Sequence, residues 1–93
     1  MEKLNIKTNN RIDLIDITDK VQSVASKSKV KDGICFIFCP HTTAGLTINE
    51  NADPSVRQDM INTLNKLVPE NAGYAHSEGN ADSHIKSSLF GSS

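Results

Sequence analysis

Short runs rich in hydrophobic residues, most of them alternating with polar ones, are typical of β-strands and occur four times along the chain. The four segments are residues 3–8, 12–17, 34–39 and 46–50. Asn9, Asn10 and Arg11 separate the first two and favour a turn, so we expect these strands to pair as a hairpin. Residues 34–39 are apolar on both faces, which predicts a central strand that is covered on both sides.

Two other segments combine helical spacing with residues that start or stop helices. Thr18 is a typical N-cap for a helix near 19–28. Asp53 followed by Pro54 starts a second helix, because Asp caps the first amides and Pro suits the first helical position, and Pro69 ends it. The apolar stripe of this second helix consists of Val56, Met60, Leu64 and Leu67.

A third helix is expected near the end of the chain. Asn80 is its expected N-cap, one face carries Ala81, Ile85 and Leu89, and Gly91 ends it. The predicted order of elements is therefore β-β-α-β-β-α-α. Adjacent strands favour hairpins over parallel crossovers, so the sequence predicts an α+β fold with a largely antiparallel sheet and flanking helices.

Composition limits the size and the class of the protein. The chain has 93 residues, of which 37% are hydrophobic and 4% aromatic, so we expect one domain over residues 1–93 with a small aliphatic core and a tendency to oligomerise. Its 10 Lys and Arg residues face 11 Asp and Glu residues, so no basic excess indicates a nucleic-acid binder. We find no apolar run of about 20 residues for a membrane span and no signal peptide, which predicts a cytoplasmic protein.

Both cysteines, Cys35 and Cys39, lie in the third predicted strand. Four residues of a strand span about 13 Å, which is too far for a disulfide between them. We therefore expect free thiols that are packed inside an apolar strand rather than reactive.

His41 follows this strand in a loop that also contains Thr42, Thr43 and Gly45. A titratable ring beside two hydroxyl groups on a loop is typical of a binding or catalytic site, and glycine lets a ligand approach the backbone closely. A purely structural turn explains the same residues, so the local pattern leaves both interpretations open.

His76 and His84 lie in a polar segment, the first in a loop and the second one turn into the third predicted helix. Neutral imidazoles bind Zn²⁺ and similar metals at about 2.0–2.1 Å. A loop that folds back would bring both rings, with His41 as a third, to one metal ion. An ordinary solvated loop is the alternative.

Acidic candidates accompany the histidines. Glu50 ends a predicted strand, Asp53 is explained as a helix cap, and Asp59 lies beside the apolar stripe of the second helix, where solvation is the alternative. The chain has no phosphate loop, GxGxxG, GxSxG or paired CxxC motif, so nucleophile-based hydrolysis has no support. The hypothesis that remains is a site of histidines and carboxylates with a divalent metal and a phosphate-bearing ligand.

Several separated motifs occur in an order that resembles one known family. They are Phe38 to Pro54, with Pro40-His41-Thr42-Thr43-Ala44-Gly45 inside it; Asp59; Leu67-Val68-Pro69; Tyr74-Ala75-His76; Gly79-Asn80-Ala81-Asp82-Ser83-His84; and Leu89-Phe90-Gly91-Ser92-Ser93. This set is similar to the signature of the YjbQ-like family, an uncharacterised family often labelled secondary thiamine-phosphate synthase. The resemblance covers nearly all of the chain.

The resemblance implies two antiparallel sheets layered around helices, a two-layer β-sandwich-like core, and a homotrimer. Members of the family usually continue into further strands with a Trp-Gln motif and a late Pro-Arg-rich segment, so it also implies that the C-terminal strands are absent here. It implies that the three histidines converge. The residues implied to lie near them are Thr42, Thr43, Glu50, Asp53, Asp59 and Asn80.

These implications assign roles to the candidate residues. The catalytic candidates are His41, Glu50 and Asp59; the ligand-binding candidates are Thr42, Thr43 and Asn80; the metal candidates are His41, His76 and His84. The family label implies joining a pyrimidine pyrophosphate to a thiazole phosphate with a divalent metal, Zn²⁺ or Mg²⁺. Because Arg11 and Arg57 are the only arginines, we expect this activity to be weak at most. The alternative is a non-catalytic trimeric module that binds a metal or a small ligand.

Overall fold

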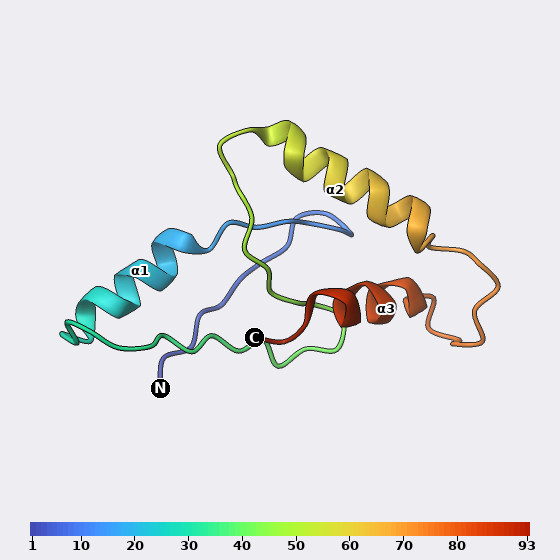
Figure 1. Cartoon of the computed structure of the whole chain (residues 1–93). Coiled ribbons are helices and arrows are strands. Elements are labelled where there is room, and N and C mark those ends of the chain that lie inside the picture. Colours follow the sequence, from blue (N-terminus) through green and yellow to red (C-terminus); the bar gives the residue numbers. More distant parts are fainter. The chain divides into compact units, whose positions relative to one another are not determined.

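The computed structural model describes all 93 residues and contains three helices (Figure 1). The helices are α1, Thr18–Lys27; α2, Pro54–Leu67; and α3, Ala81–Phe90. The chain divides into two units, Met1–Cys35 with α1 and Phe36–Ser93 with α2 and α3. All candidate site residues lie in the second unit. None of the helices is long and apolar enough to cross a membrane.

The predicted α+β fold is wrong, because the structure contains no β-strand. The segments expected as strands, which are 3–8, 12–17, 34–39 and 46–50, run as chain without regular pairing (Figure 1). Alternation indicates only that a segment suits a strand, whereas a strand forms when its N–H and C=O groups pair with those of a neighbour. No segment supplies that pairing here, so neither the hairpin nor a layered sheet forms.

The third predicted strand also lacks its expected cover. Ile34, Phe36 and Phe38 are 98%, 78% and 59% exposed. Both cysteines are free, as predicted, but Cys35 is exposed and Cys39 is half-buried. The predicted burial of the thiols is therefore wrong, because no sheet neighbour covers the segment that carries them.

Asp13 fixes the turn that precedes α1. Its carboxylate accepts hydrogen bonds from the backbone N–H of Asn9 at 2.7 Å and of Asn10 at 3.0 Å, and from the Asn10 side-chain amide at 2.9 Å. The bond from the Asn10 side chain is the main reason why the pKa of Asp13 lies below its ordinary value. Figure 1 shows the chain reversing direction here, so a turn forms although the flanking segments do not pair.

The start of α1 differs by one residue from the prediction. Thr18 is the first helical residue rather than the N-cap, and Ile17 occupies the cap position without a side-chain hydrogen bond. The Asp16 carboxylate instead accepts a hydrogen bond from the Thr18 N–H at 2.9 Å. Val21 and Val24 are half-buried and lie on one face of this helix.

Local signals predict both ends of α2 correctly. Asp53 caps the helix by accepting a hydrogen bond from the Ser55 N–H at 2.9 Å, and Pro54 takes the first helical position. The helix ends before Pro69. Leu67 is 70% exposed, so the predicted apolar stripe is confirmed only over its first part. The half-buried members of the stripe are Val56, Met60 and Leu64.

We expect acid to loosen the first turn of α2. The hydrogen bond from the Ser55 N–H lowers the pKa of Asp53 below its ordinary value of 3.8. A lowered pKa contributes stability that is present above the unfolded pKa and is lost as the pH falls through the folded pKa. Circular dichroism during acid titration should therefore show a loss of helix that is smaller in Asp53→Asn, since Asn caps without titrating. Equal acid sensitivity of the two proteins would contradict this prediction.

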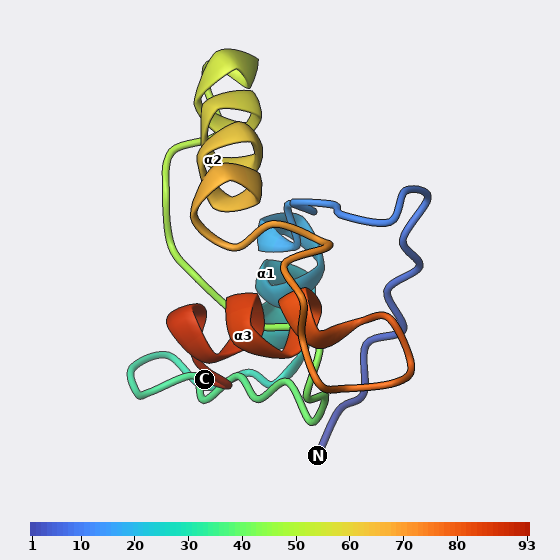
Figure 2. The same ribbon diagram turned by 90° about the vertical axis from the view of Figure 1, so that its right-hand side faces the viewer.

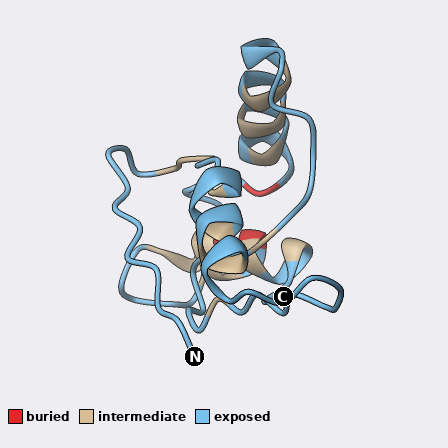
Figure 3. Ribbon diagram, turned by 90° about the vertical axis from the view of Figure 1, so that its left-hand side faces the viewer, coloured by how far each residue is buried: buried red, intermediate tan, exposed pale blue.

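The buried face of α3 is polar. Asp82 is fully buried and Lys86 is 7% exposed, whereas Ile85 and Leu89 are 42% and 62% exposed. Val68, directly after α2, is the one buried hydrophobic residue (Figure 3). The apolar face predicted for this helix therefore lies largely in solvent.

Lys86 connects α3 to α2. Its ammonium group donates hydrogen bonds to Asp82 Oδ2 at 2.9 Å and to Asn65 Oδ1 on α2 at 2.8 Å. Figures 1 and 2 show α3 beneath the C-terminal end of α2. This polar contact therefore fixes the helix that carries His84 to its neighbour.

Candidate functional site

The loop between α2 and α3 is folded back on itself and carries His76. The Tyr74 hydroxyl donates a hydrogen bond to the Pro69 carbonyl at 2.6 Å, which ties the middle of the loop to its start. Gly73 and Gly79 have φ values of 72° and 78°, in the left-handed region that glycine adopts without strain. These features turn the loop toward the beginning of α3.

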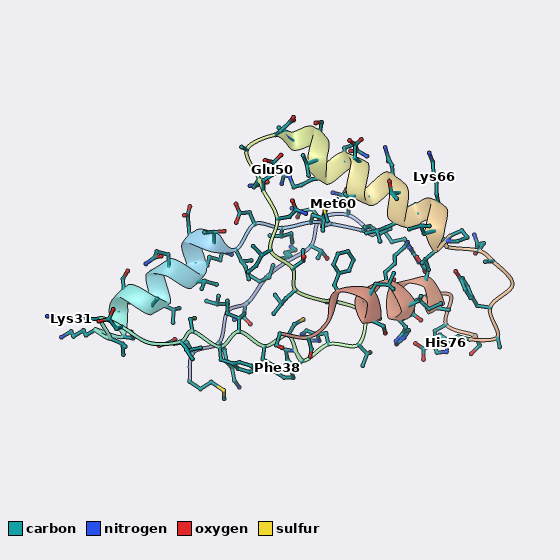
Figure 4. The ribbon with its side chains drawn as sticks, viewed as in Figure 1. Lys31, Phe38, Glu50, Met60, Lys66 and His76 are labelled. Atoms are coloured by element: carbon teal, nitrogen blue, oxygen red, sulfur yellow. The ribbon has the colours of Figure 1, made fainter.

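As a result, His76 meets His84. Their ring centroids are 5.3 Å apart and the rings stand edge-to-face, at 83° to each other. His84 lies in the first part of α3, and Figure 4 shows His76 beside the start of this helix. The Glu78 carboxylate lies 3.7 Å from His76 Nε2 and pairs with it when the ring is protonated. The structure thus brings two of the predicted metal ligands together.

A small pocket of about 200 Å³ is lined by His76, one member of this pair. It is lined by the loop between α2 and α3 and by Ala81, and its ionisable side chains are Glu70, Tyr74 and His76. Pockets for drug-sized ligands usually measure about 300–1,000 Å³. The pocket therefore suits a hydrated ion or one small polar group of a ligand.

Asn80 carries a buried polar atom with no hydrogen-bond partner. It occupies the cap position of α3, but its side chain caps nothing, so the predicted capping role is wrong. Its Oδ1 atom is buried and accepts no hydrogen bond. An unpaired buried acceptor costs about 1–3 kcal/mol, so this oxygen marks a place for a hydrogen-bond donor. Its ligand-binding role stays a prediction.

The loop that carries His41 is attached to α3 by a side chain. The Ser87 hydroxyl donates to the Thr42 carbonyl at 2.6 Å and also lies 2.9 Å from the His84 carbonyl. Thr42 therefore contributes its backbone oxygen to this contact. The binding roles predicted for the side chains of Thr42 and Thr43 stay predictions.

Backbone contacts hold both ends of the same loop. The Cys39 N–H donates to the Ser92 carbonyl at 2.8 Å, and the Leu46 N–H donates to the Gly91 carbonyl at 3.0 Å. Gly45 lies so close to Gly91 that a Cβ atom there would be 2.9 Å from its carbonyl oxygen. The ends of the loop are therefore docked on Gly91 and Ser92, directly after α3, whereas His84 lies in the first half of the helix.

The positions of the two loops determine which of the candidate metal ligands lie close together. No group of three or more His, Cys, Asp or Glu side chains lies close enough to hold a metal ion. The predicted convergence of three histidines is thus not formed in this arrangement: His76 and His84 meet, and His41 belongs to a loop docked further along α3.

The histidine pair by itself has the spacing of two ligands on one ion. Imidazole nitrogens at about 2.0–2.1 Å from a tetrahedral metal place the ring centroids about 5 Å apart. The observed separation of 5.3 Å agrees with that value. Two imidazoles leave the other coordination positions to water or ligand atoms, which is typical of an open site and not of a closed structural one.

The acidic candidates lie elsewhere. Glu50 is exposed on the segment that leads to α2, and its N–H donates to Asn49 Oδ1 at 2.8 Å (Figure 4). Asp53 caps α2, as predicted. Asp59 lines a mostly apolar pocket of about 390 Å³ together with residues of α2 and Phe90. No contact of the structure links Glu50 or Asp59 to the histidine pair, so their catalytic roles stay predictions.

The sequence patterns missed the most buried polar residues of the unit. Asp82 and Lys86 are four residues apart, a spacing that favours an ion pair on a helix, but nothing local shows that the pair is buried. The bridging role of Ser87 has no sequence signal, because its partner Thr42 lies 45 residues earlier in the chain.

The sequence matches a model of the family described as UPF0047 protein YjbQ-like over residues 2–93. This chain belongs to the YjbQ/UPF0047 family. It is 62% identical over 91 residues to a UPF0047 protein of Methanocaldococcus jannaschii, an alignment that covers 98% of this chain and 66% of the relative. It is 45% identical to the UPF0047 protein YugU of Bacillus subtilis, over 100% of this chain and 71% of the relative. The predicted family is thus confirmed.

Solved structures that are similar to this chain agree with this assignment. A crystal structure of an uncharacterised conserved protein of the family from Clostridium acetobutylicum superposes with a TM-score of 0.91 at 52% identity, covering 94% of this chain and 67% of that one. A conserved hypothetical protein from Thermus thermophilus gives a TM-score of 0.70 at 38% identity, covering 84% and 60%. The chain therefore spans about two thirds of the length of its YjbQ/UPF0047 relatives.

Proposed function

We propose that this YjbQ/UPF0047 chain binds a divalent metal ion through His76 and His84 and, with the metal, a small phosphorylated ligand. The observation that carries the proposal is the 5.3 Å separation of the two rings beside a small pocket. Because both donors are imidazoles, Zn²⁺ is favoured over Mg²⁺, which prefers oxygen ligands. A bound ion of this kind supplies positive charge to phosphate oxygens.

The charges around the pocket support a role for the metal in binding phosphate. The lining contains Glu70 and His76 but neither Lys nor Arg. Such a lining offers no permanent cation to a phosphate, whereas proteins that bind phosphate directly use Arg or Lys. A phosphorylated ligand at this pocket therefore depends on the metal for its counter-charge.

We assign His41 to the ligand side of the site. Its loop is docked on the helix that carries His84, through the contact of Ser87 with Thr42, but its ring does not complete a metal-binding group. The thiamine-phosphate synthase activity, the homotrimer and the cytoplasmic location that the resemblance and composition imply stay predictions, because no contact of the structure favours them.

We expect His84→Ala and His76→Ala to weaken zinc binding about 100-fold or more, since each variant removes one of two protein ligands. Isothermal titration of the untagged 93-residue chain with Zn²⁺ measures this. His41→Ala is the matched control, because it removes an imidazole outside the pair and should leave the zinc affinity nearly unchanged. Equal zinc affinity of all four proteins, or no binding by the parent chain, would overturn the proposed function.

A further inference from the structure

Ser87 makes a hydrogen bond that its neighbour does not. Its hydroxyl reaches the Thr42 carbonyl at 2.6 Å, across to the loop that carries His41, and the His84 carbonyl at 2.9 Å within α3. Ser88 donates to the same His84 carbonyl at 2.9 Å, a contact that stays within α3. The two serines therefore share one local contact and differ in the contact to the loop.

The hydrogen bond from Ser87 to Thr42 is important because it contacts the middle of the loop. Both other bonds from the loop, from the Cys39 and Leu46 N–H groups, involve only backbone atoms and lie at the loop ends. Thr42 lies between these two residues and directly follows His41. Ser87 thus holds the middle of the loop, and it holds it to the turn of α3 that carries His84.

We propose that Ser87 is a positioning residue that fixes His41 relative to the His76–His84 pair. Without its hydroxyl the loop is held only by the backbone bonds of its two ends to Gly91 and Ser92, directly after α3. The whole loop, its ends included, then opens more often, and the residues between the ends lose their attachment. His41 then samples more orientations, so a ligand bound at the pair meets it less often in the binding geometry. The part of this inference that concerns the ligand rests on the proposed function, in which His41 faces the phosphorylated ligand.

The experiment compares Ser87→Ala with Ser88→Ala in the full 93-residue chain. Amide hydrogen exchange followed by NMR reports loop docking without any metal, with the Val68 amide, bonded to the Leu64 carbonyl at 2.8 Å, as internal reference. We expect Ser87→Ala to speed exchange of the Leu46 amide about fivefold, and Ser88→Ala to leave it unchanged, because one hydrogen bond of typical strength is lost from the loop.

A second measurement uses inorganic phosphate as the probe on the zinc-loaded proteins. Ser87→Ala should lower phosphate affinity about fivefold, and this loss should disappear in a His41→Ala background if the serine acts through His41. Unchanged Leu46 exchange in Ser87→Ala, or an equal loss of affinity with and without His41, overturns the inference. If the parent chain binds neither zinc nor phosphate, the proposed function fails. The hydrogen-exchange comparison alone then decides whether Ser87 positions the loop.

Discussion

Asp82→Ala should lower the free energy of unfolding of the chain by about 3–5 kcal/mol, the cost of breaking a buried ion pair by removing one partner. The Asp82 side chain is fully buried, and the Lys86 ammonium lies 2.9 Å from it with 9% of its side chain exposed. In the variant, the Lys86 ammonium group keeps its hydrogen bond to the neutral side-chain oxygen of Asn65 but loses its charged partner. Since small domains are stable by about 5–15 kcal/mol, urea unfolding followed by circular dichroism should show a large part of that stability lost.

Two further variants serve as controls for this measurement. Gln58→Ala removes an exposed side-chain bond to Asn62 at the same four-residue spacing on α2, and should change stability by less than about 0.5 kcal/mol. The double variant Asp82→Leu with Lys86→Met removes both charges and should recover much of the loss, because no buried charge stays unpaired. A loss in Asp82→Ala no greater than in Gln58→Ala would show that the buried pair does not hold α3 in place.

Signals confined to a few neighbouring residues predicted the helices well. Asp53, Pro54 and Pro69 set the two ends of α2 because capping and the missing proline N–H act within one turn. The prediction for α3 was correct about the helix and wrong about its face. Which side of a helix is buried depends on its partner, here Asn65 on α2, and local spacing does not contain that information.

The strands failed for a related reason. Residues 34–39 have the composition of a covered strand, yet Phe36 and Phe38 are mostly exposed because no other segment pairs with them. Alternation of apolar and polar residues is a property of a single strand. A sheet also needs hydrogen bonds to a second strand, and the sequence pattern of one strand does not specify its partner. Resemblance to the family predicted the meeting of His76 and His84, whereas their spacing alone left it open.

The contacts of two different loops with α3 explain why the candidate site was only partly predictable. The order of the motifs identified His41, His76 and His84 as candidates, but it did not determine whether the three side chains lie close together. The loop that follows α2 folds back to the start of α3, while the loop with His41 docks near its end, through Ser87 and Gly91. His84 and Ser87 are three residues apart, about 4.5 Å along the helix axis. The two loops therefore contact neighbouring positions of α3, but a shared helix does not by itself bring the His41 ring to the histidine pair.

We expect Gly45→Ala to destabilise this docked loop by about 1–3 kcal/mol, the usual cost of overpacking. A Cβ atom at Gly45 would lie 2.9 Å from the Gly91 carbonyl oxygen and 3.0 Å from Phe90 Cβ. The first of these atoms accepts the hydrogen bond from the Leu46 N–H, so moving it away weakens that bond as well. Faster hydrogen exchange of the Leu46 amide together with a lower urea midpoint measures both effects.

Gly33→Ala provides the matched control in the other unit of the chain. A Cβ atom there would meet the end of one flexible side chain, Val30 Cγ1 at 3.3 Å, and no backbone atom. Its effect on stability should therefore be small, with a gain from the less flexible unfolded chain offsetting the tight contact. If Gly45→Ala is no more damaging than Gly33→Ala, the close approach to Gly91 does not hold the loop. The attachment of His41 to α3 would then depend on hydrogen bonds alone, above all on that of Ser87.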